Sequence, residues 1–390
     1  MSQFDQLINR DHSWSEKYDA RRRLYGRDDA MPMWVADMDF ATPEFVINAL
    51  QQRLQHPILG YSQFPQQLKQ TVVDWQTRQH QWTPAADSVL WLSGVVSGLY
   101  LAVQTFTRPG DGVMVFTPIY PPFMKSVTDQ NRRLVTQALH LINNRYELDF
   151  DAIEQQIQSQ QVTLLMISNP HNPAGRLWTQ AELSQLGQIC LRHQVKLVVD
   201  EIWSDLNHSQ QPHIPLAAIA TELADICITL NSASKTFNLA ALHSAYAIIA
   251  NPTMRQAFSQ TQQQTRAAEP NLFGMIALQA AYSDQGQAWL QDLNRYIGGL
   301  VDEAETFFKP ADMPQLMRPQ ASYLLWLDCR HLFANDAEMQ AWWLNEAGLA
   351  LSAGTHFSAA GSGFMRMNIG LPRARLQQAF SQIKQACLHR

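Results

Sequence analysis

Residues 162–200 read VTLLMISNPHNPAGRLWTQAELSQLGQICLRHQVKLVVD, and this stretch decides the fold. It begins with an apolar run of strand length, 162–168, and ends with a second one, 196–200. Between the two runs, Thr179 and Glu182 have the spacing of a capping box, in which each side chain accepts a hydrogen bond from the other residue's backbone N–H at the start of a helix. The stretch therefore predicts a strand, a helix and a second strand parallel to the first.

Similar apolar runs lie on both sides of this unit, with amphipathic stretches between them, at 112–116, 225–230 and 244–250. Such alternation predicts an α/β fold with a mostly parallel central sheet flanked by helices. The first 45 residues contain no sheet unit, and the part after about residue 285 mixes helical stretches with a strand-like run. We therefore expect a large domain over 48–285 and a smaller α+β domain formed by 1–47 together with 286–390.

The composition narrows the class of protein. The chain has 390 residues, of which 46% are hydrophobic and 16% charged, and its net charge is −5 at pH 7, so we expect a folded protein that does not bind nucleic acid. The polar start of the chain contains no apolar signal-peptide core, which predicts a cytoplasmic protein without a membrane span. The four cysteines are far apart and lack metal-ligand spacing, so no metal site is expected.

Two residues at strand ends carry the chemistry. Lys235 follows the run at 225–230, and Asp200 closes the run at 196–200, and ligands of α/β sheets bind where strands end. An amine there can form a Schiff base with pyridoxal 5′-phosphate (PLP), and a carboxylate can keep the pyridine nitrogen protonated, so that the ring accepts electrons from a carbanion. Each residue alone is more often a surface charge or a helix cap, but the pair together predicts a PLP site.

A phosphate group needs N–H and hydroxyl donors. The sequence SGVVSG at 93–98 follows an apolar run and precedes an amphipathic stretch that ends near Phe106, so it can present the start of a helix to an anion. Ser232 and Ser234 flank Lys235 and add hydroxyl donors from the same turn. Each of these features taken alone is also typical of an ordinary loop.

Three further residues have side chains suited to a ligand. Tyr120 follows a strand in a turn rich in proline, where its ring can stack on a flat cofactor or simply fill the turn. The two Asn-Pro steps of NPHNPAG, 169–175, hold that loop in an extended shape that can aim an amide at a ligand oxygen. Arg366 alternates with apolar neighbours as in a strand, and it either pairs with a substrate carboxylate or lies on an edge strand.

The order of Tyr120, NPHNPAG (169–175), DEIW (200–203), SASK (232–235) and Arg366 resembles the class I/II aminotransferase superfamily of fold type I. A closer resemblance, to the MalY/PatB group of cystathionine β-lyases, lies in four segments: MWVADMDF (33–40), GYS (60–62), PHNP (170–173) and SKTFNL (234–239). It covers nearly the whole chain.

This resemblance implies a role for each matching residue. Lys235 and Asp200 are the implied catalytic residues, with Lys235 bound to PLP and Asp200 paired with its pyridine nitrogen. Arg366 and Asn172 are implied to bind the substrate, covered by the segment that contains Ala36. The remaining implied contacts to the cofactor are ring stacking by Tyr120, a bond from Asn172 to the 3′ oxygen, and phosphate contacts from Val95, Val96, Ser232, Ser234 and, from a neighbouring subunit, Tyr61. A homodimer with shared sites is therefore expected.

Three positions depart from the pattern of the family. Trp203 stands where histidine or tyrosine is usual, and an indole donates one N–H and accepts no hydrogen bond. Ala241 stands where glycine is typical, and His243 stands where many aminotransferases have a phosphate-binding arginine. We therefore expect phosphate binding to be weaker or to depend more on backbone donors.

The activity implied by the resemblance is a carbon–sulfur β-lyase in methionine biosynthesis and amino-acid metabolism. It would act on cystathionine or related cysteine S-conjugates by α,β-elimination, which yields pyruvate, ammonia and a thiol. Two alternatives remain open at this point. One is an aminotransferase that uses the same residues, and the other is a regulatory protein that binds a transcription factor in addition to its enzyme activity.

Overall fold

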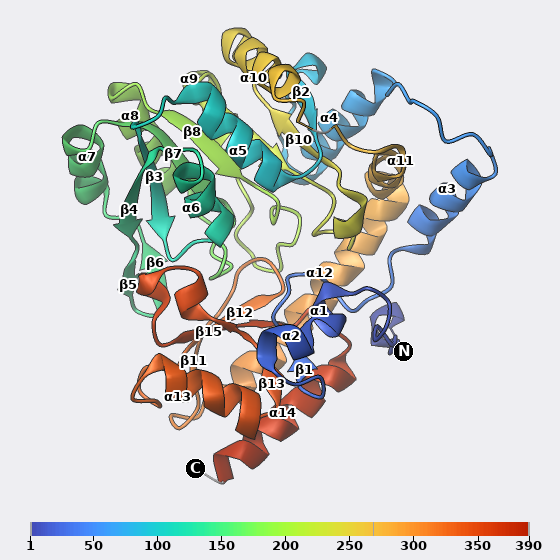
Figure 1. Cartoon of the computed structure of the whole chain (residues 1–390), viewed down its shortest axis with the longest axis vertical. Coiled ribbons are helices and arrows are strands. Elements are labelled where there is room, and N and C mark those ends of the chain that lie inside the picture. Colours follow the sequence, from blue (N-terminus) through green and yellow to red (C-terminus); the bar gives the residue numbers. More distant parts are fainter. Residues whose placement is uncertain (1, 268, 389–390) are drawn as a thin grey trace.

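The computed structural model describes residues 2–267 and 269–388. A seven-stranded sheet with its helices forms the upper part of the molecule in Figure 1, and a four-stranded sheet with two long helices forms the lower part. The large sheet contains β2 (Val89–Leu92), β3 (Gly112–Thr117), β4 (Arg133–Ala138), β7 (Val162–Ser168), β8 (Lys196–Asp200), β9 (Cys227–Asn231) and β10 (Ala245–Ile248). The predicted α/β fold is confirmed.

The strand order of the large sheet is β2-β10-β9-β8-β7-β3-β4. β4, β3, β7, β8 and β9 pair in parallel, whereas β10 is antiparallel to both of its neighbours, β9 and β2. The predicted mostly parallel sheet is confirmed, and β10 is the strand that runs against its neighbours. An apolar run that is buried on both faces has the same composition in either direction, so the sequence carries no signal of the reversal.

Helices cover both faces of this sheet, and the strands are apolar on both faces for that reason. Side chains alternate along a strand, so Val113 and Val115 face one apolar cluster while Met114 and Phe116 face the other. The first cluster includes α5 (Val95–Phe106), α6 (Pro121–Thr128) and α10 (Pro252–Gln264), and the second includes α7 (Phe150–Ser159), α8 (Gln180–Arg192) and α9 (Thr221–Ala224). The predicted capping box of Thr179 and Glu182 starts α8.

The smaller sheet has the order β11-β12-β15-β14, with strands β11 (Gln315–Met317), β12 (Leu324–Asp328), β14 (Ser352–Ala353) and β15 (Phe364–Asn368). α12 (Asp284–Phe307) and α14 (Arg373–Leu388) share a core with it. The start of the chain contributes one short strand, β1 (Met31–Pro32), which pairs in parallel with β13 (Leu349–Ala350) from the C-terminal part of the chain.

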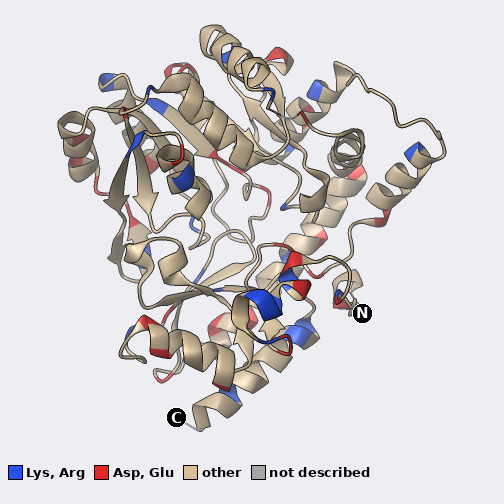
Figure 2. Ribbon diagram, viewed as in Figure 1, with Lys and Arg blue, Asp and Glu red and all other residues tan. Residues whose placement is uncertain are grey.

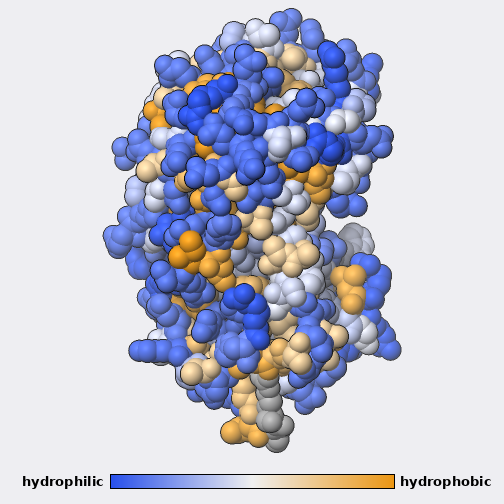
Figure 3. Space-filling view, turned by 90° about the vertical axis from the view of Figure 1, so that its left-hand side faces the viewer, coloured by the Kyte–Doolittle hydropathy of each residue, from blue (hydrophilic) through white to orange (hydrophobic). Residues whose placement is uncertain are grey.

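The remaining helices and strands are α1 (Glu16–Asp19), α2 (Arg21–Tyr25), α3 (Glu44–Leu54), α4 (Gln67–His80), α11 (Leu272–Ala281), α13 (Asp336–Ala341) and the hairpin of β5 (His140–Ile142) with β6 (Arg145–Glu147). Of these, α3, α4, α11 and α13 add buried side chains to the core that includes α12 and α14. Within the described ranges, no helix combines the length and apolarity needed to cross a membrane, and no group of three or more His, Cys, Asp or Glu side chains could hold a metal ion. The face in Figure 3 is mainly hydrophilic, with small apolar patches.

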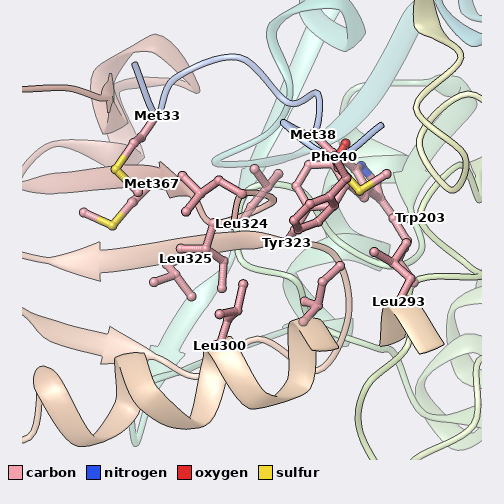
Figure 4. Packing of buried hydrophobic residues seen from close by; sticks show 14 of the residues in the cluster. Met33, Met38, Phe40, Trp203, Leu293, Leu300, Tyr323, Leu324, Leu325 and Met367 are labelled. Carbon is pink, nitrogen blue, oxygen red and sulfur yellow. The ribbon is translucent and has the colours of Figure 1, made fainter. Parts of the chain in front are cut away.

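An extended segment, residues 33–40, joins the two parts of the structure. Met33 packs beside Met367 of β15, and Met38 and Phe40 lie against Tyr323, with Trp203 close by (Figure 4). We propose the same division into domains that the sequence predicts, 48–285 against 1–47 with 286–390, because all strands of the large sheet lie inside the first range and those of the small sheet lie in the second.

A tight backbone crossing in the small domain supplies a stability test. A Cβ at Gly361 would lie 2.1 Å from the carbonyl oxygen of Gly354, which belongs to the backbone and cannot rotate away. We expect Gly361→Ala to lower the free energy of unfolding by about 1–3 kcal/mol, as other overpacked sites do. Gly298→Ala in α12 is the control, because its Cβ would meet only ordinary contacts, and it should stabilise the helix by about 0.5–1 kcal/mol. Urea denaturation measures both, and equal effects would contradict the crossing.

Candidate active site

The candidate site lies where strands of the large sheet end. Parallel strands end at the same edge, so the residues that follow them meet there. β9 leads to Lys235, β8 ends at Asp200, β7 leads to Asn172, β3 leads to Tyr120, and β2 leads to the start of α5. Two predicted residues reach this edge from other parts of the structure, Arg366 from β15 and Ala36 from the segment 33–40.

Lys235 lies in the turn after β9, where hydrogen bonds fix both its amine and the residue next to it. Its Nζ donates a hydrogen bond of 2.7 Å to the carbonyl oxygen of Ala36 and lies 5.7 Å from the ring centre of Trp203. The neighbouring Thr236 is fully buried, and its hydroxyl donates to the carboxylate of Asp205 at 3.0 Å. The hydrogen bond from Thr236 to Asp205 therefore fixes the backbone next to Lys235, while the Lys235 amine faces the site.

The pKa of Lys235 is lowered to about 8, chiefly by burial and with a smaller contribution from the positive charge of Arg366, while the charges of Asp37 and Asp200 oppose the change. Burial acts in this direction because a low-dielectric surrounding disfavours the charged form of an amine. An amine with such a pKa is partly neutral near physiological pH, so Lys235 can act as a nucleophile and as a base.

Asp200 is buried, and its carboxylate accepts a 3.0 Å hydrogen bond from the N–H of Ile202. Burial raises the pKa of Asp200 to about 7, against the opposing effects of that hydrogen bond and of Lys235, while Glu201 adds to the rise. A cationic N–H donor placed beside this carboxylate would favour its ionised form. A protonated ring nitrogen is such a donor.

Arg366 is a buried cation that forms no ion pair within the part of the chain that the structure describes. One Nη donates to Asn172 Oδ1 at 3.1 Å and the other to the carbonyl of Trp34 at 2.8 Å, and the guanidinium stacks on Phe357 at 4.7 Å from the ring centre. Its Nε is buried without a hydrogen-bond partner, and no carboxylate in the described part of the chain forms an ion pair with it. Burial lowers the pKa of Arg366 to about 10, and nearby tyrosines oppose the change.

The structure excludes the alternative that Arg366 lies on an edge strand. β15 lies between β12 and β14, so Arg366 is on an inner strand and not on an edge. Burying an unpaired charge is costly, and a carboxylate from a ligand would remove that cost through two parallel N–H···O bonds. The chemistry of Arg366 therefore fits a ligand that carries a carboxylate.

The start of α5 offers donors to an anion. Val95 and Val96 are its first two residues, and the first N–H groups of a helix have no acceptor within the helix. Ser234 is partly exposed in the Lys235 turn. Ser232, by contrast, donates to the carbonyl of Ser244 at 2.6 Å and accepts from the N–H of Ser234, so it can donate to an anion only after releasing Ser244.

The other predicted residues differ in their surroundings. Tyr120 is half-buried at the start of α6, and burial raises its pKa, opposed by Arg366 and assisted by Asp200, so it lies within range of both charges. Tyr61 is fully exposed in the loop between α3 and α4 and takes no part in this chain's own site. Ala241 and His243 are exposed, and His243 has a φ of 47° in the left-handed region.

Several residues at the site were not predicted from the sequence. Tyr323 donates to the same Ala36 carbonyl as Lys235, at 3.1 Å, and its ring packs edge-on against Trp203. Asp205 collects hydrogen bonds from Trp75 and His80 in addition to Thr236. Tyr323 starts a strand-like run, and Asp205 lies two residues after Trp203, but neither position alone signals its contact, because each partner is more than thirty residues away or in another element.

A family model described as aminotransferase class I and II matches residues 28–383. The chain belongs to the class I and II aminotransferase family. It is 40% identical over 385 residues to cystathionine beta-lyase PatB from Bacillus subtilis, which covers 98% of this chain and 99% of that protein. The predicted resemblance to the MalY/PatB group is thereby confirmed.

Two solved structures of the family are close to this one. A PLP-bound putative aminotransferase from Clostridium difficile has a TM-score of 0.95 and 33% identity, over 98% of this chain and 99% of that chain. A PLP-bound C-S lyase from Staphylococcus hominis, complexed with the inhibitor L-cycloserine, has a TM-score of 0.91 and 31% identity, over 98% of both chains.

The residues at the strand ends fit the PLP that these family members bind. A partly neutral amine suits the aldehyde, a buried carboxylate with a single backbone donor suits the ring nitrogen, and the first N–H groups of α5 suit the phosphate. This edge of the sheet thus offers a suitable group to the aldehyde, to the ring nitrogen and to the phosphate of the cofactor.

The lowered pKa of Lys235 can be measured directly. Acetic anhydride reacts only with neutral amines, so labelling of the cofactor-free protein across pH, followed by peptide mass spectrometry, yields the pKa of this side chain. We expect about 8. In Arg366→Gln the pKa should rise, because a cation that lowers it is gone. An ordinary value near 10.5 in both proteins would contradict the burial of the amine.

Proposed function

We propose that this protein is a PLP-dependent carbon–sulfur β-lyase that acts on cystathionine or related cysteine S-conjugates. The observation that carries the proposal is the buried, anion-free Arg366 beside Asn172, on the same site as the Lys235 amine. Together they match an amino acid, whose carboxylate and amino group must be held at once. The name of the relative from Bacillus subtilis, cystathionine beta-lyase, supports the reaction type.

The residues that would hold PLP are those at the strand ends. Lys235 would bind the aldehyde carbon, Asp200 the protonated ring nitrogen, Tyr120 the ring face and Asn172 the 3′ oxygen. The phosphate would be bound by the N–H groups at Val95 and Val96 and by the hydroxyls of Ser232 and Ser234. When bound, PLP supplies an electron sink that makes the Cα proton of an amino acid acidic enough to remove.

Three residues at the site have separate roles in the proposed reaction. Arg366 binds the α-carboxylate and so fixes which Cα bond faces the site, and Lys235, released as a neutral amine, accepts the Cα proton. With PLP bound, the Asp200 carboxylate would pair with the protonated ring nitrogen and so support the electron sink that the cofactor would supply. The bond from Cβ to sulfur breaks, the sulfur leaves as a thiolate that gains a proton, and water completes the reaction to pyruvate and ammonia.

A homodimer with shared sites is part of the proposal. The loop after α3 extends away from the body of the chain (Figure 1), and Ile58, Leu59 and Tyr61 on it are more than half exposed. Tyr61 would reach the phosphate at the partner's site, and packing of the loop against a second copy would cover these apolar side chains. We further propose a cytoplasmic role in methionine biosynthesis, because the substrate and the cofactor are both metabolites of the cell interior.

The reaction type is tested by the need for a keto acid. A β-lyase releases pyruvate from cystathionine without any added keto acid, whereas an aminotransferase needs one to turn over. We expect pyruvate in a lactate dehydrogenase assay with cystathionine alone, and none from Lys235→Ala, which loses the amine that accepts the proton. Transfer of the amino group to an added keto acid with no thiol release would instead identify an aminotransferase.

The role of Arg366 is tested by a change of shape at constant charge. Arg366→Lys keeps a cation but loses the planar fork, so we expect kcat/KM to fall roughly tenfold to more than a hundredfold, which corresponds to about 1.5–3 kcal/mol for a charge-assisted hydrogen bond. The control compares an S-substituted cysteine with its decarboxylated amine. The wild type should strongly prefer the acid, and if Arg366→Ala kept that preference the carboxylate would bind elsewhere.

A further inference from the structure

The segment 33–40, which follows β1, has no regular secondary structure, and its Ala36 carbonyl lies against the Lys235 amine. Its backbone carbonyls are bound mainly by side chains from other elements. Trp34 O accepts from Arg366 and Ser352, Val35 O and Asp37 O accept from Asn368, Ala36 O accepts from Lys235 and Tyr323, and Met38 O and Phe40 O accept from Asn238. The place of the Ala36 carbonyl thus depends on how the rest of this segment is held.

Two cations near the N-terminus hold its carboxylates. Arg10 pairs with Asp37 and with Asp39, each at 2.6 Å, and Lys17 Nζ lies 3.0 Å from the Asp39 carboxylate and 3.6 Å from that of Asp37. Tyr18 donates its hydroxyl to Asp39 at 2.9 Å. We call these five residues the N-terminal ion cluster, and Figure 2 shows basic and acidic residues interspersed around α1 and α2.

The cluster is unusual for its burial. The side chain of Lys17 is 0% exposed and that of Asp39 is 6% exposed. Taking paired charges out of water costs about as much as their attraction returns, so such pairs contribute little to stability and are better understood as fixing geometry. Arg10 and Lys17 also donate to the backbone, at Met38 O over 3.2 Å and at Asp37 O over 3.4 Å.

One charge of the cluster, that of Asp37, acts on the Lys235 amine. Asp37 directly follows Ala36, and its charge acts on Lys235 together with those of Arg366 and Asp200, while the hydroxyls of Tyr323 and Tyr120 are the other titratable groups that face the site. Within the cluster two cations balance two carboxylates. Loss of one charge would therefore leave a net charge beside Lys235.

We infer that Arg10 and Lys17 are positioning residues of the active site, which hold the Ala36 carbonyl against the Lys235 amine and balance the carboxylates beside it. Their side chains bond to the segment 33–40 and not to Lys235, so they act on the amine through that segment. This inference rests on the proposed PLP enzyme, but its test reads the electrostatics at Lys235 and does not require a particular substrate or reaction.

The test measures the pH at which the visible absorbance of the bound cofactor changes in the holoenzyme, because that change follows the proton on the Lys235 nitrogen. Lys17→Met leaves a net negative charge and should move the midpoint upward, since an anion favours the protonated form. Asp39→Asn leaves a net positive charge and should move it downward. We expect shifts of about half a pH unit, roughly a threefold change in the ionisation equilibrium.

The double variant with Lys17→Met and Asp39→Asn restores the balance and should return the midpoint toward that of the wild type. Asp37→Asn is a second way to remove one carboxylate, and it should shift the midpoint in the same direction as Asp39→Asn. Arg22→Met is the matched control, because Arg22 pairs with Asp28 on the surface and its loss changes the total charge equally. It should leave the midpoint unchanged.

Opposite shifts with recovery in the double variant would support the inference. If the two single variants moved the midpoint in the same direction, or left it where it was, the cluster would be a structural feature alone and the inference would be wrong. If the wild type released no pyruvate but the opposite shifts were still present, the proposed reaction would be wrong. The role of the cluster would then still stand.

Discussion

The structure depends on one constraint, the need to satisfy the backbone of an extended segment that crosses between two sheets. Residues 33–40 form almost no ladder with a neighbouring strand, so their carbonyls must find side-chain donors, because an unpaired buried carbonyl is costly. Those donors come from the turn after β9, from β12 and β15, and from the N-terminus. The same hydrogen bonds that satisfy the backbone of the segment therefore also link the two sheets on either side of the site.

Burial moves three ionisable side chains at this place toward neutrality. The pKa of Lys235 falls to about 8, that of Arg366 falls to about 10 and that of Asp200 rises to about 7, in each case chiefly because the charged form loses water. Within the part of the chain that the structure describes, none of the three side chains forms a salt bridge. An amino acid together with a cationic ring would supply opposite charges, so the site is arranged for ligands and not for stability.

Much of this could be predicted from local patterns. Lys235 and Asp200 stand directly after apolar runs, and parallel strands that end at one edge bring such residues together whatever lies between them. The direction of β10 could not be predicted, because an apolar strand buried on both faces has no polarity in its composition. Trp203, a departure from the family, packs against Tyr323 and Lys235, a contact between β12 and the strand-end loops that sequence spacing does not encode.

The sequence by itself determined the α/β class, the strand positions, the capping box of α8 and the identity of the residues at the strand ends, because these follow from the periodicity of nearby residues and from short motifs. Long-range packing sets which side chains meet the Ala36 carbonyl, buries Arg366 without an ion pair among the described residues, and encloses Lys17 between Asp37 and Asp39. These are contacts between residues 20 to more than 300 positions apart. Burial and charge balance arise only when such distant residues pack together, so no local pattern can specify them.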